Sequence, residues 1–96
     1  MYGTVAHFKI KPGVENQLIE EFGDSKSLGI PGYIGSVVYQ TDSDPTHIVL
    51  VVMFESKEAY EANASSQDQD ARFRRMMSFM AAEPQWNDGE IILSDL

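Results

Sequence analysis

His47-Ile48-Val49-Leu50-Val51-Val52-Met53-Phe54 is the stretch of this sequence that decides the fold. Seven consecutive apolar residues follow the histidine, rich in the β-branched types that favour strands, and the run is too short for an independent apolar helix. Asp44-Pro45-Thr46 precedes it, and Glu55-Ser56 follows it. These features predict a strand over residues 47–54.

Both faces of this predicted strand are apolar. A strand with one face in water alternates apolar and polar residues, whereas here only His47 interrupts the two alternating sets. Both faces therefore need a cover, and a chain of 96 residues has helices for only one of them. We expect a second copy of the chain to cover the other face, which makes the protein a homodimer.

The residues before this strand predict a strand, a helix and a second strand. Residues 2–11 alternate and are expected to form a strand, after which Pro12 suits the first turn of a helix. The loop expected over residues 23–32 is rich in glycine, residues 33–40 predict an edge strand, and residues 41–46 predict a hairpin turn. The helix carries an apolar stripe of Val14, Leu18, Ile19 and Phe22.

The residues after residue 54 predict two helical segments and a last strand. Ser56 is expected to cap a helix over residues 57–64, and a second helical run has acidic-before-basic pairs at Asp68/Arg72 and Asp70/Arg74. Its Phe73, Met76, Met77 and Met80 belong either to the core or to a flexible apolar pocket. Residues 85–89 predict a turn and residues 90–93 the fourth strand.

The resulting order, β-α-β-β-α-β, is the split βαβ or ferredoxin-like arrangement of an α+β protein. It has an antiparallel four-stranded sheet, with strands one and three in the middle and both helices on one face. The strand over residues 47–54 is therefore central by topology as well as by composition. The whole chain, residues 1–96, is expected to form a single domain.

Composition restricts the partners of the protein. The formal net charge of −8 disfavours binding to nucleic acid or to anionic membrane surfaces, because both depend on clustered lysine and arginine. The absence of cysteine excludes disulfides and thiolate chemistry. We see no signal peptide and no run of about 18 apolar residues, so we expect a cytoplasmic protein without membrane partners.

Two segments resemble the antibiotic biosynthesis monooxygenase domain family. They are the opening Val5-Ala6-His7-Phe8-Lys9-Ile10-Lys11-Pro12-Gly13 and the run Phe54-Glu55-Ser56-Lys57-Glu58-Ala59-Tyr60-Glu61-Ala62-Asn63. The resemblance covers essentially the whole chain and implies a dimeric α+β barrel with a pocket between sheet and helices. For the members that are enzymes, it implies oxidation of small aromatic or quinol-type substrates by O2 without a metal or flavin cofactor.

The resemblance also implies which residues contact a substrate. Tyr60 and Arg74 match pocket positions of some family enzymes, and Phe54 and Asn63 stand where many members have Trp and His. The triad of the haem-degrading branch is not visible here. Alternatively, Tyr60 packs on a short helix, and Arg74 forms an exposed pair with Asp70 that contributes little.

His7 is the candidate catalytic residue. It lies on the first predicted strand, on the face opposite Phe8 and Ile10, and an imidazole can take a proton from a phenol near neutral pH. Alternatively, His7 forms a hydrogen bond at the dimer face. His47 is expected on the surface, and Trp86 either caps the pocket or contacts the partner subunit. Two histidines far apart in the chain give no basis for a metal site.

Three functions remain open from the sequence. The first is a cofactor-independent monooxygenase with His7 as base and with Phe54, Tyr60, Asn63 and Arg74 shaping the pocket. The second is a non-catalytic dimeric barrel that binds a small molecule or is associated with stress. The third is a structural dimer whose pocket is filled by its own Met and Phe side chains. One fold hosts many functions, so fold alone does not decide among them.

Overall fold

A computed structural model describes residues 1–23 and 25–96 of the chain. Its four strands form one antiparallel sheet in the order β2 (Tyr33–Gln40), β3 (His47–Phe54), β1 (Tyr2–Lys9) and β4 (Gln85–Glu90). Strands β1 and β3 occupy the middle, paired over their whole length from Tyr2 opposite Phe54 to Lys9 opposite His47. The ferredoxin-like fold class and the central place of residues 47–54 are therefore confirmed.

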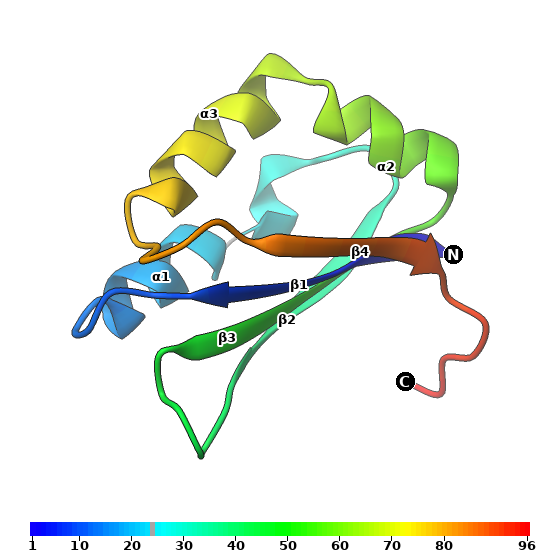
Figure 1. Ribbon diagram of the computed structural model, residues 1–96. Coiled ribbons are helices and arrows are strands. Elements are labelled where there is room, and N and C mark those ends of the chain that lie inside the picture. The colour runs from blue at the N-terminus through cyan, green and yellow to red at the C-terminus, as the bar shows by residue number, and fades with distance from the viewer. Residues whose placement is uncertain (24) are drawn as a thin grey trace.

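Helices α2 (Lys57–Ala64) and α3 (Gln67–Met77) lie on one side of this sheet (Figure 1). The predicted cap of α2 is present, since the Ser56 hydroxyl oxygen accepts the Ala59 N–H at 3.1 Å, and Ser66 caps α3 in the same way at Gln69. No helix of the described part of the chain is long and apolar enough to cross a membrane. The helical elements are α1 (Glu15–Phe22), the 3-10 helix η1 (Ser25–Leu28), α2 (Lys57–Ala64) and α3 (Gln67–Met77).

The hydrophobic core lies between the helices and the inner face of the sheet. Alternating residues of β1 and β3 point into it, and Leu18 and Met76 contribute from α1 and α3. Met76 and Met80 of the predicted apolar stripe are core residues. The buried cluster consists of Ala6, Phe8, Ile10, Leu18, Ile48, Leu50, Met76 and Met80.

The outer face of the sheet is apolar and open. Val5, Val37 and Tyr39 are 38%, 52% and 59% exposed, and Val51 between them is only half-buried. These side chains alternate with the core residues along the strands, so they share the face that the helices leave uncovered. This open apolar surface is the face of residues 47–54 for which the sequence predicts a further cover.

The fourth strand differs from its prediction. Residues 85–89, expected as a turn, form most of β4, while Ile92 and Leu93, expected in the strand, are 94% and 84% exposed. Strand β4 forms because the free edge of β1 needs hydrogen-bond partners, whatever the side chains opposite it. The last of these pairings runs from the Ile91 N–H to the Met1 carbonyl, so Ile92 and Leu93 lie past the end of β1.

Four smaller differences concern the first third of the chain. Strand β1 ends at Lys9, after which Ile10 forms an isolated bridge with Met80. Helix α1 begins only after Gly13, whose φ of +83° breaks the helical path, so Pro12 is not in its first turn. Ile19 faces away from the core at 60% exposure. The predicted loop over residues 23–32 contains η1, and its Asp24 lies outside the described residues.

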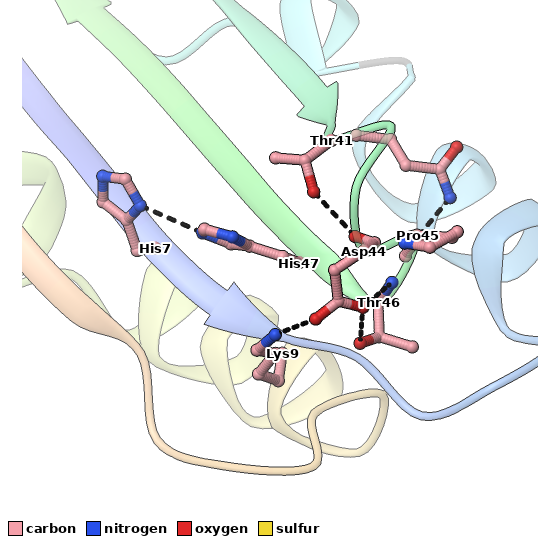
Figure 2. Close-up of polar contacts among 8 residues, drawn as sticks. His7, Lys9, Thr41, Asp44, Pro45, Thr46 and His47 are labelled. Carbon is pink, nitrogen blue, oxygen red and sulfur yellow. Dashed lines mark hydrogen bonds and ion pairs between the residues drawn. The ribbon is translucent and has the colours of Figure 1, made fainter.

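The hairpin between β2 and β3 is held together by Asp44 (Figure 2). Its carboxylate accepts hydrogen bonds from the Thr46 amide and hydroxyl at 3.0 and 2.6 Å and pairs with the Lys9 ammonium group. The hydrogen bond from Lys9, followed by those from Thr46, holds the pKa of Asp44 well below its ordinary value. Asp44 therefore stabilises the fold in its charged form.

Replacing Asp44 with Asn should remove a pH-dependent part of the stability. A carboxylate whose pKa is depressed in the folded state stabilises the fold at pH values above the ordinary carboxyl pKa. This contribution to the free energy of unfolding is lost as the pH falls below about 4. The difference in urea midpoint between the wild type and D44N should therefore be larger at pH 6 than at pH 3. A difference that is the same at both pH values would contradict this account of Asp44.

Candidate active site

A cavity of about 450 Å³ lies between the inner face of the sheet and the helices. All four strands contribute to its lining, together with α1, α2 and α3. Its apolar lining includes Leu50, Val52, Phe54, Phe73, Met76 and Trp86, and its polar lining includes Thr4, Tyr60, Asn63, Gln69, Arg72 and Asp88. A mostly apolar cavity with a few polar groups is typical of a small-molecule site.

Aromatic rings form much of the cavity wall. Phe54, at the end of β3, packs edge-on against Tyr33 and Tyr60, with ring centroids 5.6 and 5.7 Å apart. Across the cavity lining, Phe73 of α3 contacts Trp86 of β4 at 6.0 Å. Such rings favour a flat, aromatic ligand, because edge-to-face and offset-stacked contacts add to the burial of apolar surface.

Tyr60 and Asp88 form a polar pair in this wall. The Tyr60 hydroxyl donates to the Asp88 carboxylate at 2.9 Å. Burial, and then the hydrogen bond and negative charge of Asp88, raise the pKa of Tyr60 to about 12. Tyr60 is therefore a neutral hydrogen-bond donor near pH 7, and it fixes the orientation of the one carboxylate that it contacts.

Thr4 lies beside this pair. The residue is 4% exposed and stands directly opposite Asp88 in the pairing of β1 with β4. Its hydroxyl lies close enough to Tyr60 to oppose the rise in the tyrosine pKa, but it makes no hydrogen bond of normal geometry with any residue that the structure describes. A buried hydroxyl without a partner costs free energy in the folded state.

Arg72 of α3 lies elsewhere in the cavity lining within a group of side-chain amides. Its Nη2 donates to Asn63 Oδ1 at 3.3 Å and to Gln69 Oε1 at 3.0 Å, and its Nε donates to the same Gln69 oxygen at 3.2 Å. The Asn63 amide also donates to Gln69 at 3.3 Å. These bonds connect the end of α2 to the start of α3 and hold a positive charge at the cavity.

Three of the five predicted site residues lie together in the cavity lining, namely Phe54, Tyr60 and Asn63. Arg74 does not. Its side chain is 79% exposed and pairs with Asp70 at 2.8 Å, as the alternative interpretation of Arg74 expected. The predicted Asp68/Arg72 pair does not form, because Arg72 bonds to Asn63 and Gln69 instead.

His7 lies away from the cavity, on the outer face of the sheet. Its Nδ1 is 3.2 Å from Nε2 of His47, and the two imidazoles come from the neighbouring strands β1 and β3 (Figure 2). His47, expected on the surface, is half-buried in this contact. The sheet therefore separates His7 from Phe54, Tyr60 and Asn63. Among the described residues, no group of three metal-ligating side chains accompanies the histidine pair.

Sequence reasoning missed Arg72 and Asp88 as cavity residues and left Trp86 undecided between the pocket and the partner subunit. Arg72 and Arg74 are two positions apart, so they point about 200° apart around the helix. The sequence does not say which arginine faces the cavity; in the structure Arg72 does, together with Phe73 and Met76. Trp86 and Asp88 stand in a segment with the composition of a turn. Pairing with β1 places both on the inner face, opposite Ala6 and Thr4, and Trp86 thus lines the cavity.

The family model of the antibiotic biosynthesis monooxygenases matches residues 1–76. The match covers most of the chain, and the protein therefore belongs to this family. No curated protein matches the sequence significantly.

Solved structures share the fold at low sequence identity. A candidate antibiotic biosynthesis monooxygenase from Bordetella bronchiseptica is 19% identical with a TM-score of 0.79, and 96% of this chain aligns with 97% of that one. One from Nitrosomonas europaea is 18% identical with a TM-score of 0.76, over 97% of this chain and 100% of that one. A conserved protein from Methanosarcina mazei is 17% identical with a TM-score of 0.77, over 92% and 89%.

Replacing Thr4 with Val should stabilise the protein. The substitution keeps the shape of the side chain and removes the unpaired buried hydroxyl, so the free energy of unfolding should rise by about 1 kcal/mol. Urea unfolding of the wild type and T4V measures this change, and T4S, which keeps the hydroxyl, is the control. A destabilised T4V with an unchanged T4S would show instead that the hydroxyl has a partner in solution.

Proposed function

We propose that the protein is a cofactor-independent monooxygenase that oxidises a small phenol or quinol with O2 inside the cavity. The observation that carries this proposal is the Tyr60–Asp88 hydrogen bond, which orients an exposed carboxylate of the cavity lining beside aromatic rings. Membership of the antibiotic biosynthesis monooxygenase family supports it, as do solved relatives named as candidate monooxygenases.

The proposed reaction needs no external reductant. When a quinol reacts with O2, one oxygen atom enters the ring as a new hydroxyl and the other leaves as water. The quinol supplies all four electrons, and the product is the hydroxyquinone. What a protein must add is a binding site that orients the ring and a group that accepts the phenolic proton as electrons leave the ring.

Asp88 is the proposed proton acceptor. Its carboxylate lines the cavity, and the hydrogen bond from Tyr60 orients it. The sequence suggested His7 as the base. His7 lies on the outer face of the sheet, so it could act only on a substrate bound at that face. The position of the cavity favours Asp88, because a general base has to lie within hydrogen-bond reach of the proton that it takes.

Oxygen consumption with a panel of hydroquinones and dihydroxynaphthalenes tests the reaction. The Asp88→Asn variant should lose about a hundredfold in the enzymatic rate, after the uncatalysed rate is subtracted. The matched control is Asp68→Asn on the exposed surface of α3, which should keep the wild-type rate. His7→Ala should also keep it.

The other outcomes separate the remaining possibilities. Loss of turnover in His7→Ala with full turnover in Asp88→Asn would make His7 the base. Binding of the panel compounds without oxygen uptake in the wild type would support the non-catalytic binding protein. No binding at all would support the purely structural dimer.

We also propose that a second copy of the chain covers the outer face of the sheet. Val5, Val37 and Tyr39 present apolar surface there, and half-buried Val49 and Val51 continue it along β3. An apolar face at the centre of a sheet is typical of a subunit interface. The His7–His47 pair lies on the same face, so in this proposal His7 makes its hydrogen bond at the dimer interface.

Replacing Val37 with Lys should convert the dimer into a monomer. The side chain is 52% exposed in the single chain, so the fold tolerates lysine there, whereas a charge buried at the interface opposes association. Sedimentation velocity measures the change. Ile19→Lys is the matched control, because Ile19 is a similarly exposed apolar residue on α1. A monomeric wild type, or two variants that behave alike, would contradict the proposed interface.

A further inference from the structure

The charged side chains that line the cavity differ in whether they have a partner of opposite charge or a hydrogen-bond donor. Each carboxylate in the lining has a donor of its own. Asp88 accepts from Tyr60 at 2.9 Å, Asp70 pairs with Arg74 at 2.8 Å, and Glu21 pairs with Arg75 at 2.6 Å. The negative charges of this cavity are therefore already balanced or hydrogen-bonded before any ligand enters.

Arg72 is the exception. No carboxylate of residues 1–23 and 25–96 forms an ion pair with it, and its hydrogen-bond acceptors are the neutral amides of Asn63 and Gln69. These bonds use Nε and Nη2, and within the described chain Nη1 makes none. The two amides thus fix the guanidinium in place without neutralising it.

A half-buried guanidinium without a counter-ion is unusual in a protein whose net charge is −8. Such a chain has many carboxylates that could pair with Arg72, as Asp70 and Glu21 pair with its neighbours on α3. A positive charge in an apolar cavity attracts an anion from solution, and a guanidinium is suited to carboxylates by its charge and its planar set of donors. The cavity therefore favours an anionic ligand at Arg72.

The opposite charge at Asp88 determines which way such a ligand lies. An anionic group is repelled by the Asp88 carboxylate, whereas a phenolic hydroxyl can donate to it. Tyr60, which orients Asp88, and Asn63, which holds Arg72, are three residues apart on α2, so they lie about one helical turn from each other on the same face. The two charged groups are therefore held from neighbouring positions of one helix, which suits a small ring ligand that contacts both.

We propose that the cavity binds a hydroxylated aromatic acid, with its carboxylate on Arg72 and its hydroxyl toward Asp88. The binding mode names a substrate class for the proposed monooxygenase and in that respect rests on the proposed function. The binding itself does not depend on whether oxygen is consumed.

Fluorescence titration under nitrogen with 6-hydroxy-2-naphthoate and its methyl ester tests the proposal. The two probes share the ring and the hydroxyl and differ in the charge at the carboxyl end. The wild type should bind the acid about tenfold more tightly than the ester, or better, because a charged hydrogen bond is lost in the ester. Arg72→Gln should bind both probes alike, while Arg72→Lys keeps the charge and part of the preference.

Arg74→Gln is the matched control. Arg74 lies two positions along the same helix, is 79% exposed, and points away from the cavity, so its loss should leave the preference for the acid unchanged. Circular dichroism of each variant shows that the fold is kept. The proposal is overturned if the wild type binds neither probe, if it has no preference for the acid, or if the two glutamine variants lose the preference equally.

Turnover measurements separate this proposal from the proposed function. Preferential binding of the acid with no oxygen uptake by any quinol would leave the Arg72 site in place and contradict the monooxygenase. Oxygen uptake with uncharged quinols, together with equal binding of acid and ester, would support the monooxygenase and contradict the Arg72 site.

Discussion

Strand β3 has apolar side chains on both of its faces, and the rest of the structure depends on how each face is covered. Ile48, Leu50 and Phe54 point to the helices and are almost fully buried. Val49 and Val51, on the other face, are only half-buried, and Val37 and Tyr39 beside them are more exposed. The hydrophobic effect fixes the first layer within one chain, and we propose that a second copy of the chain covers the other face.

The cavity follows from the same arrangement. At one end of β3 the core is filled by Ile48 and its neighbours, whereas toward Phe54 a cavity remains between the sheet and the helices, and aromatic rings form part of its wall. Polar groups enter that wall from three directions, since Asp88 comes from β4, Tyr60 and Asn63 from α2, and Arg72 from α3. Hydrogen bonds between these elements hold the charges at fixed positions, which is what orientation of a substrate requires.

Much of the fold could be predicted from the sequence. The apolar run at residues 47–54, the alternation of residues 2–9 and the capping role of Ser56 each indicate the observed element. Strand β4 could not be predicted, because its residues 85–90 carry turn-forming side chains and pair only because the edge of β1 is free. Ile92 and Leu93 have the composition of a strand and lack a neighbour to pair with.

The site was predictable only in part, because helix rotation and strand pairing decide which side chains face the cavity. Phe54, Tyr60 and Asn63 belong to elements whose limits the sequence indicates, and they meet in the cavity. Which of Arg72 and Arg74 faces the cavity depends on the rotation of α3 about its axis. The position of Asp88 depends on the register of β4, a strand whose residues have the composition of a turn. His7 and His47 lie 40 positions apart, and only the pairing of β1 with β3 brings them together.

We propose that one face of β3 serves a binding cavity and that the other face contacts a second copy of the chain. A native mass spectrum of the protein with added 6-hydroxy-2-naphthoate tests both parts at once, because it reports subunit number and bound ligand together. The account predicts a dimer that carries up to two molecules of the acid. A monomer would contradict the role of the outer face, and a dimer without any bound acid would contradict the role of the cavity.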